Sequence, residues 1–253
     1  MADVVGKPGR TAVETRLGSL RDELDVDFCV VNGENAADGV GITPKLAERL
    51  LAAGADVITL GNHVWRRAEI VPYLNGAARV IRPANLSPTG PGRPLCVFPA
   101  RDGTPVAVIN VMGQLFLDVA MSPFSVIDAL VEEARRETPV IVVDMHAEAT
   151  SEKVAIARWL DGKVTAVVGT HTHVQTNDAR VQRGGTAALT DAGMTGPHDS
   201  VIGVVAERAI KRMRTHMPVR FETGTEDVRI EGALIECDAS GRAGGIELVR
   251  VSV

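Results

Sequence analysis

The chain has 253 residues, of which 45% are hydrophobic, 23% are charged and 3% are aromatic. This composition excludes a disordered chain, and the length suits one large domain, so we expect a single domain over residues 1–253. The formal net charge of −5 argues against binding to duplex nucleic acid, which requires a basic surface. We find neither a signal peptide nor a membrane-spanning stretch, and we therefore expect a cytoplasmic protein that does not bind a membrane.

The first residues read like the loop that connects a strand to a helix. Asp3, Gly6 and Gly9 lie in this segment, but only Met1 and Ala2 precede Asp3. Either the chain begins on a loop, or an N-terminal strand is missing from this sequence. The expected fold could therefore lack its first strand.

Short apolar runs rich in β-branched residues recur along the first two thirds of the chain. They are apolar at consecutive positions more than at alternate ones, which is typical of strands that are buried on both faces. Each run is too short for a typical helix. The predicted strands are Val26–Val31, Asp56–Leu60, Val106–Val111, Val140–Val143 and Val164–Val168.

Stretches with helical spacing lie between these runs. One opens with Thr43 and Pro44, a good N-cap followed by proline at the first helical position, and it ends before Gly54. The predicted helices are Thr43–Ala53, Phe124–Glu137 and Ser151–Leu160. Because strands, loops and helices alternate, the sequence predicts an α/β fold.

The last third of the chain changes character, because β-prone segments follow one another there. They are Thr186–Thr190, Val219–Glu222, Val228–Cys237 and Gly245–Val253. Turn residues separate them, which predicts an antiparallel sheet added to the first half. We expect the two halves to pack as facing sheets with helices outside.

Polar residues follow directly after four of the predicted strands. In an open α/β sheet, ligands bind beyond the carboxyl ends of the strands, so these residues are expected to meet at one edge. A single instance would mean little, but four strands that each deliver metal-ligand residue types indicate a metal site. The four segments are Asn32–Asn35, Gly61–His63, Asp144–His146 and Gly169–His173.

Four of the six histidines lie in these segments, namely His63, His146, His171 and His173. Any one of them, taken singly, is more often a hydrogen-bonded loop residue than a metal ligand. His171 and His173 are two residues apart, and in an extended segment their rings would point the same way and serve one metal or two adjacent ones. We therefore weigh metal ligation above the loop role for this pair, and also for His146 and His63.

The charges of the candidate ligands suit a pair of metals. Asp3 and Glu34 bring two negative charges, whereas asparagine and neutral histidine bring none. Two divalent ions would leave the centre with a charge of about +2, which suits a phosphate ester and lowers the pKa of a bound water. A bridging carboxylate would hold the ions roughly 3.5–4 Å apart, and Glu34 is the candidate. Nitrogen and oxygen ligands favour manganese, iron or zinc over magnesium or calcium.

These residues, in this order, resemble the motifs of the calcineurin-like metallophosphoesterases, and more closely those of the bacterial YmdB-like subfamily. The resemblance runs essentially end to end and implies a four-layer αββα sandwich. The matching stretches are Asp3–Arg10, Asn32–Asn35, Gly61–His63, Asp144–Thr150, Gly169–His173 and Asp191–Gly196. Many calcineurin-like enzymes have Asp-x-His in the first motif, whereas this chain has valine at position 5, and Asn35 is the candidate to replace the lost histidine.

The resemblance also implies roles for single residues. One metal would be held by Asp3, Glu34, Asn35 and His173, and the second by Glu34, Asn62, His146 and His171. His63 would be no ligand; it would protonate the leaving oxygen or stabilise the phosphorane. The subfamily is associated with phosphodiesterase activity on 2′,3′-cyclic nucleotides, with iron or manganese centres and with oligomers.

The sequence thus predicts a dinuclear metal-dependent phosphodiesterase that forms a homo-oligomer. Its expected substrate is a small phosphodiester, with 2′,3′-cAMP as first choice, hydrolysed by a metal-activated water or hydroxide with His63 as proton donor. Iron or manganese is expected, and zinc would also suit. Two alternatives stay open. One is a non-catalytic signalling or scaffold protein with a degenerate metal site. The other is an amidohydrolase-like metal hydrolase, which also uses His-x-His, but on the first strand of its fold.

Overall fold

The apolar runs of the sequence form strands with two buried faces, in a computed structural model that describes residues 1–117 and 120–253. In β3 (Val57–Thr59), Ile58 packs among helical side chains, whereas Val57 lies between two sheets. In β6 (Pro105–Met112), Ile109 likewise packs among helical side chains, and Val108 lies between the two sheets. The apolar residues of these strands are consecutive because neither face meets water.

One layer consists of two short sheets that meet at the N-terminus. Its strands are β1 Asp3–Val4, β11 Met194–Pro197, β12 Val228–Cys237 and β13 Ala243–Ser252 in the first sheet, and β2 Val30–Asn32, β3 and β4 Val80–Ile81 in the second. The second sheet is parallel, and in the first only β1 and β11 are parallel. The Met1 ammonium donates to the Val30 carbonyl at 2.8 Å, and the Asn32 amide donates to the Met1 carbonyl at 3.3 Å. The two sheets therefore continue one another.

The facing layer is a six-stranded sheet. Its strands, in spatial order, are β5 Leu95–Pro99, β6, β7 Ile141–His146, β8 Ala166–Thr170, β10 Ala187–Leu189 and β9 Arg180–Val181. The four central strands are parallel, and β5 and β9 pair antiparallel at the edges. His146 lies opposite Thr170, so β7 and β8 end at the same edge of the sheet.

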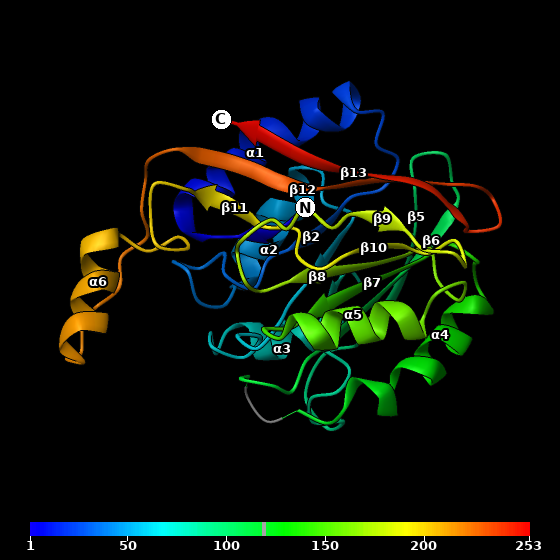
Figure 1. Ribbon diagram of the computed structural model, residues 1–253, viewed down its shortest axis with the longest axis horizontal. Coiled ribbons are helices and arrows are strands. Elements are labelled where there is room, and N and C mark those ends of the chain that lie inside the picture. Colours follow the sequence, from blue (N-terminus) through cyan, green and yellow to red (C-terminus); the bar gives the residue numbers. More distant parts are fainter. Residues whose placement is uncertain (118–119) are drawn as a thin grey trace.

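Helices cover the outer side of each layer. α1 Gly6–Glu23, α2 Pro44–Ala52 and α3 Ile70–Gly76 pack on the first layer, and α4 Ile127–Arg135, preceded by the 3-10 turn Pro123–Ser125, and α5 Thr150–Trp159 pack on the second. In Figure 1, α1 lies on one side of the stacked strands, and α4 and α5 lie on the other. The order helix, sheet, sheet, helix confirms the predicted α/β sandwich, and the three predicted helices are present with ends shifted by a few residues.

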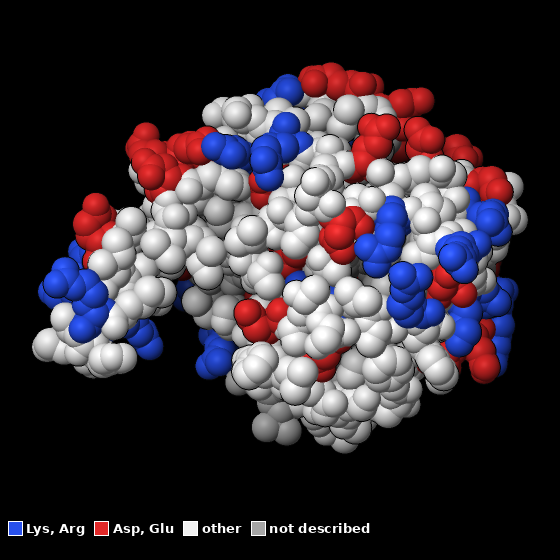
Figure 2. Space-filling model, in the orientation of Figure 1, with Lys and Arg blue, Asp and Glu red and all other residues white. Residues whose placement is uncertain are grey.

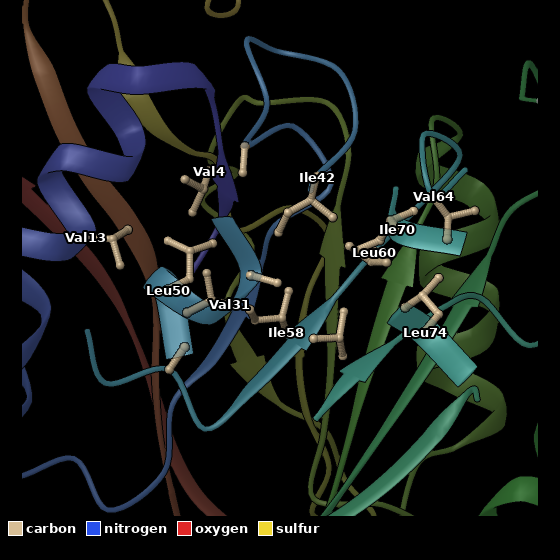
Figure 3. Close-up of a cluster of buried hydrophobic side chains, with 14 of the residues drawn as sticks. Val4, Val13, Val31, Ile42, Leu50, Ile58, Leu60, Val64, Ile70 and Leu74 are labelled. Carbon is tan, nitrogen blue, oxygen red and sulfur yellow. The ribbon is translucent and has the colours of Figure 1, made fainter. Parts of the chain in front are cut away.

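A buried apolar cluster fixes the first layer against its helices (Figure 3). Val13 of α1 and Leu50 of α2 lie on one side of this cluster, and Val31 and Ile58 come from the strands beneath them. Leu74 extends the same cluster to α3. Each of these side chains is at most 1% exposed, so the strands that lead into the polar segments are held rigidly.

The N-terminal strand that the sequence left in question is present, although it is short. Asp3 and Val4 form β1, in which Asp3 lies opposite Met194 of β11. Both residues are fully buried. The chain then enters α1 directly at Gly6.

Two predictions for the last third are wrong. Thr186–Thr190 was expected in the antiparallel sheet, but β10 lies parallel to β8 in the other layer, because β-propensity does not decide which sheet a strand joins. Val219–Glu222 forms no strand; this segment is mostly exposed, so its β-prone side chains have no sheet to pack on, and only the neighbouring Thr223 makes a single bridge to Val204.

Helix α6 (Ala206–Thr215) projects from the body of the molecule (Figure 1), and its buried residue is Ala209. Figure 2 shows lysines and arginines gathered on this helix, while acidic and basic side chains are interspersed over the rest of the face in view. Within residues 1–117 and 120–253, no helix is both long and apolar enough to cross a bilayer.

Two glycines of α1 offer a matched test of its close contact with β11. A Cβ at Gly9 would lie 2.2 Å from the Thr195 carbonyl oxygen, whereas a Cβ at Gly18 meets nothing within 4 Å. We expect Gly9→Ala to lower the free energy of unfolding by about 1–3 kcal/mol through overpacking. Gly18→Ala should raise it by about 0.5–1 kcal/mol, because alanine favours the helix. Urea denaturation measures both, and equal effects would contradict this account of the interface.

Candidate metal centre

The predicted ligands lie at the carboxyl ends of five strands, where the two layers meet. They are Asp3 in β1, Glu34 and Asn35 after β2, Asn62 after β3, His146 at the end of β7, and His171 and His173 after β8. Ligands from both layers touch: Glu34 Oε1 of the first layer lies 3.2 Å from His146 Nε2 of the second. The structure thus brings all seven predicted ligands together, with His63 beside them.

One group of donor atoms surrounds the side chain of Asn35. Its amide nitrogen lies 3.4 Å from Asp3 Oδ1, 3.1 Å from Glu34 Oε1 and 3.1 Å from His173 Nε2. Burial raises the pKa of Asp3 to about 6. The amide nitrogen therefore stands where three lone pairs converge. A half-turn of the carboxamide exchanges its nitrogen for its oxygen, and ligation by Asn35 requires the oxygen to face this group.

A second group surrounds the Nε2 atom of His146. Asn62 Oδ1 lies at 3.1 Å, Glu34 Oε1 at 3.2 Å and His171 Nδ1 at 3.1 Å from it. The donor atoms of Glu34, His146 and His171 all lie within 4.8 Å of one another. These four residues are the ones predicted for the second metal.

The carboxylate of Glu34 belongs to both groups. Its side chain is fully buried, and its second oxygen accepts the backbone N–H of His63 at 3.1 Å. Burial opposes the charge, but His146 and His63 outweigh burial and hold the pKa of Glu34 well below its usual range. A charged carboxylate shared by two sets of donors is the arrangement that a bridging ligand needs.

Hydrogen bonds beneath the site fix the tautomer of His146. The Thr170 hydroxyl donates to Asp144 Oδ1 at 2.7 Å, so it accepts from His146 Nδ1, which lies 2.9 Å away. In the neutral ring Nε2 then carries a lone pair. That lone pair faces the carboxylate, amide and imidazole lone pairs described above. Such a convergence is repulsive unless a proton or a cation lies between the atoms, so the donor set fits a divalent metal.

The charge balance around His146 supports the same conclusion. Burial opposes an imidazolium, but the carboxylates of Glu34, Asp3 and Asp144 outweigh burial and raise the pKa of His146 to about 9. Burial and the neighbouring His146 lower the pKa of His171 to about 3. In the metal-free protein, a proton on His146 balances the carboxylates, and His171 stays neutral, as a metal ligand must.

The two histidines of the Gly-Thr-His-Thr-His segment differ from the prediction in one respect. They were expected in an extended segment with parallel rings, but their φ angles are +101° at His171 and +62° at His173. The rings consequently serve different groups, because His171 Nδ1 meets His146 and His173 Nε2 meets Asn35. This division matches the ligand sets that the family resemblance implies.

His63 lies at the edge of the site rather than inside a group of donors. Its Nδ1 is 2.8 Å from Asn35 Oδ1, and its side chain is 24% exposed, whereas that of Glu34 is 0% exposed. A held but accessible imidazole suits proton transfer to a bound substrate. The position of His63 is compatible with its predicted catalytic role, which stays a prediction.

Several supporting residues are not among the predicted ones. Thr170 and Asp144 orient His146; both lie in segments that the sequence singled out, but it gave neither of them a role. Gly61 has a clearer signal, because it precedes Asn62 in the Gly-Asn-His motif. A Cβ at Gly61 would lie 2.3 Å from both Glu34 Oε2 and His146 Nε2, so the backbone itself forms one wall of the centre.

The close approach at Gly61 gives a direct test of the site. Gly61→Ala would push Glu34 and His146 apart, and we expect Mn²⁺ affinity to fall by about 10–100-fold, as for other changes that misplace ligands. Titration calorimetry of the metal-free protein measures this. Gly76→Ala is the control, because a Cβ there meets nothing within 4 Å. Unchanged affinity in Gly61→Ala would contradict the placement of the metals beside this backbone.

The chain matches known proteins over most of its own length and most of theirs. It is 44% identical over 238 residues to a 2′,3′-cyclic-nucleotide 2′-phosphodiesterase of Bacillus subtilis (strain 168), covering 94% of this chain and 90% of the relative. Among solved structures, a hypothetical protein from Thermus thermophilus matches with a TM-score of 0.93 and 37% identity, covering 99% of this chain and 97% of the other. A novel phosphatase from Mycoplasma pneumoniae matches with a TM-score of 0.91 and 33% identity, covering 99% and 91%. The YmdB-like protein family model matches residues 1–249, and the chain therefore belongs to the YmdB-like protein family.

Proposed function

We propose that this protein is a dinuclear metal-dependent phosphodiesterase that hydrolyses 2′,3′-cyclic nucleotides. The observation that carries the proposal is the buried Glu34 carboxylate, which is shared by two groups of nitrogen and oxygen donors. The activity of the Bacillus subtilis relative supports the substrate class. A phosphate ester suits such a site, because two divalent ions would leave it with a positive charge of about +2.

The proposed ligands divide as the donor groups do. Asp3, Glu34, Asn35 and His173 would hold one metal, and Glu34, Asn62, His146 and His171 the other. When bound, the two ions would polarise the phosphate and supply a nucleophilic water. Thr170 holds the His146 ring with its Nε2 toward the site, and Gly61 leaves the room that the metals need.

His63 is the proposed proton donor for the leaving oxygen. In the reaction, water adds a hydroxyl to phosphorus, the bond from phosphorus to one ribose oxygen breaks, and that oxygen takes a proton. The Asn35 carboxamide lies against His63 Nδ1, which is 2.8 Å from Oδ1 in this structure; with Oδ1 turned to a metal, the NH2 group would donate to Nδ1 instead, and the exposed side of the ring stays open to the substrate. The name of the relative indicates that the 2′ oxygen is the leaving group there, and we propose the same for this chain.

The identity of the metals as iron or manganese, with zinc as a further candidate, stays a prediction from the sequence. So do the cytoplasmic location and the homo-oligomer. The short N-terminus favoured the alternative of a non-catalytic scaffold, but Asp3 is fully buried in β1, in the same place as the other predicted ligands. The amidohydrolase-like alternative requires His-x-His on the first strand, whereas here it follows β8.

Two substrates distinguish a proton donor from a ligand at position 63. For His63→Ala we expect kcat with 2′,3′-cAMP to fall by about 10²–10⁴-fold, the usual contribution of general acid catalysis. The loss with bis-p-nitrophenyl phosphate should be much smaller, because p-nitrophenolate leaves without a proton. Metal content by mass spectrometry should match that of the unchanged protein. Equal losses on both substrates, or a loss of metal, would contradict the proposed role of His63. If the metal-loaded wild type turns over neither substrate, the proposed function is wrong.

Metal binding should depend on pH in a defined direction. Because the pKa of His146 is raised to about 9, the metal-free protein carries this proton at neutral pH, and a metal must displace it. We expect Mn²⁺ affinity to rise with pH up to about 9, and calorimetry at pH 7 should show an enthalpy that varies with the ionisation enthalpy of the buffer. His146→Gln should abolish most of this variation. An enthalpy that does not vary with the buffer would contradict proton displacement.

A further inference from the structure

Asp191 belongs to a stretch that resembles the family motifs, yet it is in neither group of donors. It lies on the segment that leads from β10 in the second layer to β11 in the first. Its side chain is buried, and so is that of Lys153 in α5, whose Nζ donates to Asp191 Oδ2 at 2.7 Å. The pair is a fully buried salt bridge at the junction of the two layers.

The carboxylate of Asp191 also holds the turn that carries two predicted ligands. Its Oδ2 accepts the backbone N–H of Thr172 at 3.1 Å and the Thr172 hydroxyl at 2.8 Å. Its Oδ1 accepts the backbone N–H of Gly193 at 2.8 Å, just before β11. Asp191 thus binds the residue that separates His171 from His173.

That turn needs an anchor because its backbone is strained. Both histidines have φ angles in the left-handed region, which residues other than glycine rarely adopt. Such residues persist where their surroundings over-determine them. The left-handed turn is also what sends His171 toward His146 and His173 toward Asn35. The conformation that Asp191 holds is therefore the one that divides the ligands between the two groups.

We infer that the Lys153–Asp191 salt bridge is a positioning device that sets the metal affinity of the centre by clamping Thr172. The inference rests on the proposed function, because it assumes that His171 and His173 hold metals. A carboxylate is a stronger acceptor for the Thr172 N–H than a neutral group, and the Lys153 ammonium lies 2.7 Å from Asp191 Oδ2 where both side chains are buried. A buried salt bridge contributes little stability over well-packed apolar residues, so stability alone does not account for it.

The test compares two salt bridges of the full-length protein. Arg21 and Asp56 form a second largely buried pair, with Arg21 Nη1 2.8 Å from Asp56 Oδ2, but Asp56 precedes β3 and thus lies at the opposite end of the strand from Asn62. Lys153→Met and Arg21→Met each leave a carboxylate without its cation, and both should lower the melting temperature. Only Lys153→Met should weaken Mn²⁺ binding, by about 10–100-fold, as is typical when a partner of a metal ligand is lost. Calorimetric titration of the metal-free proteins measures Kd and stoichiometry.

A gentler pair of variants keeps the test decisive if Lys153→Met does not fold. Thr172→Val keeps the shape and the backbone N–H but loses the hydroxyl, whereas Thr172→Ser keeps the hydroxyl. We expect Mn²⁺ affinity to fall by about 10-fold in the valine variant and to stay near wild type in the serine variant.

The outcomes separate this inference from the proposed function. Wild-type affinity in Thr172→Val, or an equal loss in Arg21→Met and Lys153→Met, would overturn the positioning role while leaving the metal centre intact. A wild-type protein that binds no Mn²⁺, iron or zinc would overturn the proposed function itself. Loss confined to Lys153→Met and Thr172→Val supports the clamp.

Discussion

Glu34 carries its negative charge at a place with no solvent, and the surrounding structure is arranged to balance that charge. An unpaired carboxylate in a protein interior is very costly, so it must meet cations or protonated groups. The Nε2 atom of His146 lies 3.2 Å from Glu34 Oε1, and the Nδ1 atom of His63 lies 3.4 Å from the same oxygen. Because His146 belongs to the second layer and Glu34 to the first, the balance is possible only where the edges of both layers meet. The sandwich therefore brings the ends of strands from both layers together around one buried charge.

The groups that hold the predicted ligands are buried too. Asp144 and Thr170 act on the rear of the His146 ring, and Asp191 acts on the backbone between two other imidazoles. Neither carboxylate belongs to the predicted ligand set, so each contributes orientation. Polar residues of this kind are costly inside a protein unless every hydrogen bond is made, which makes the centre rigid when it is complete. Gly61 has no side chain, and this leaves the space that Glu34 and His146 occupy.

The sequence predicted most of the strands, and it placed the candidate ligands at strand ends, because both signals are local; the strand predicted at Val26–Val31 begins only at Val30. A run of apolar residues followed by Asn, Glu or His identifies a strand end without any knowledge of its neighbours. Thr170 and Lys153 escaped prediction because their roles depend on partners 24 and 38 residues away along the chain. The same reason explains the error at Thr186–Thr190, whose sheet is chosen by tertiary pairing. The two imidazoles diverge because of a left-handed turn, and one anchor of that turn, Asp191, lies 19 residues away along the chain.

The predicted ligands are spread from Asp3 to His173, which matters for how the molecule folds. Asp3 Oδ2 accepts the backbone N–H of His171 at 3.2 Å, a contact between segments 168 residues apart. Closing so long a loop costs chain entropy before any local contact repays it. The centre is therefore expected to form late in folding, after the separate layers, and a fragment that ends before β7 would hold no histidine ligand at all. A metal bound there would join the first strand to the segment after β8 in the second layer, so its stabilisation by mass action would extend to both layers.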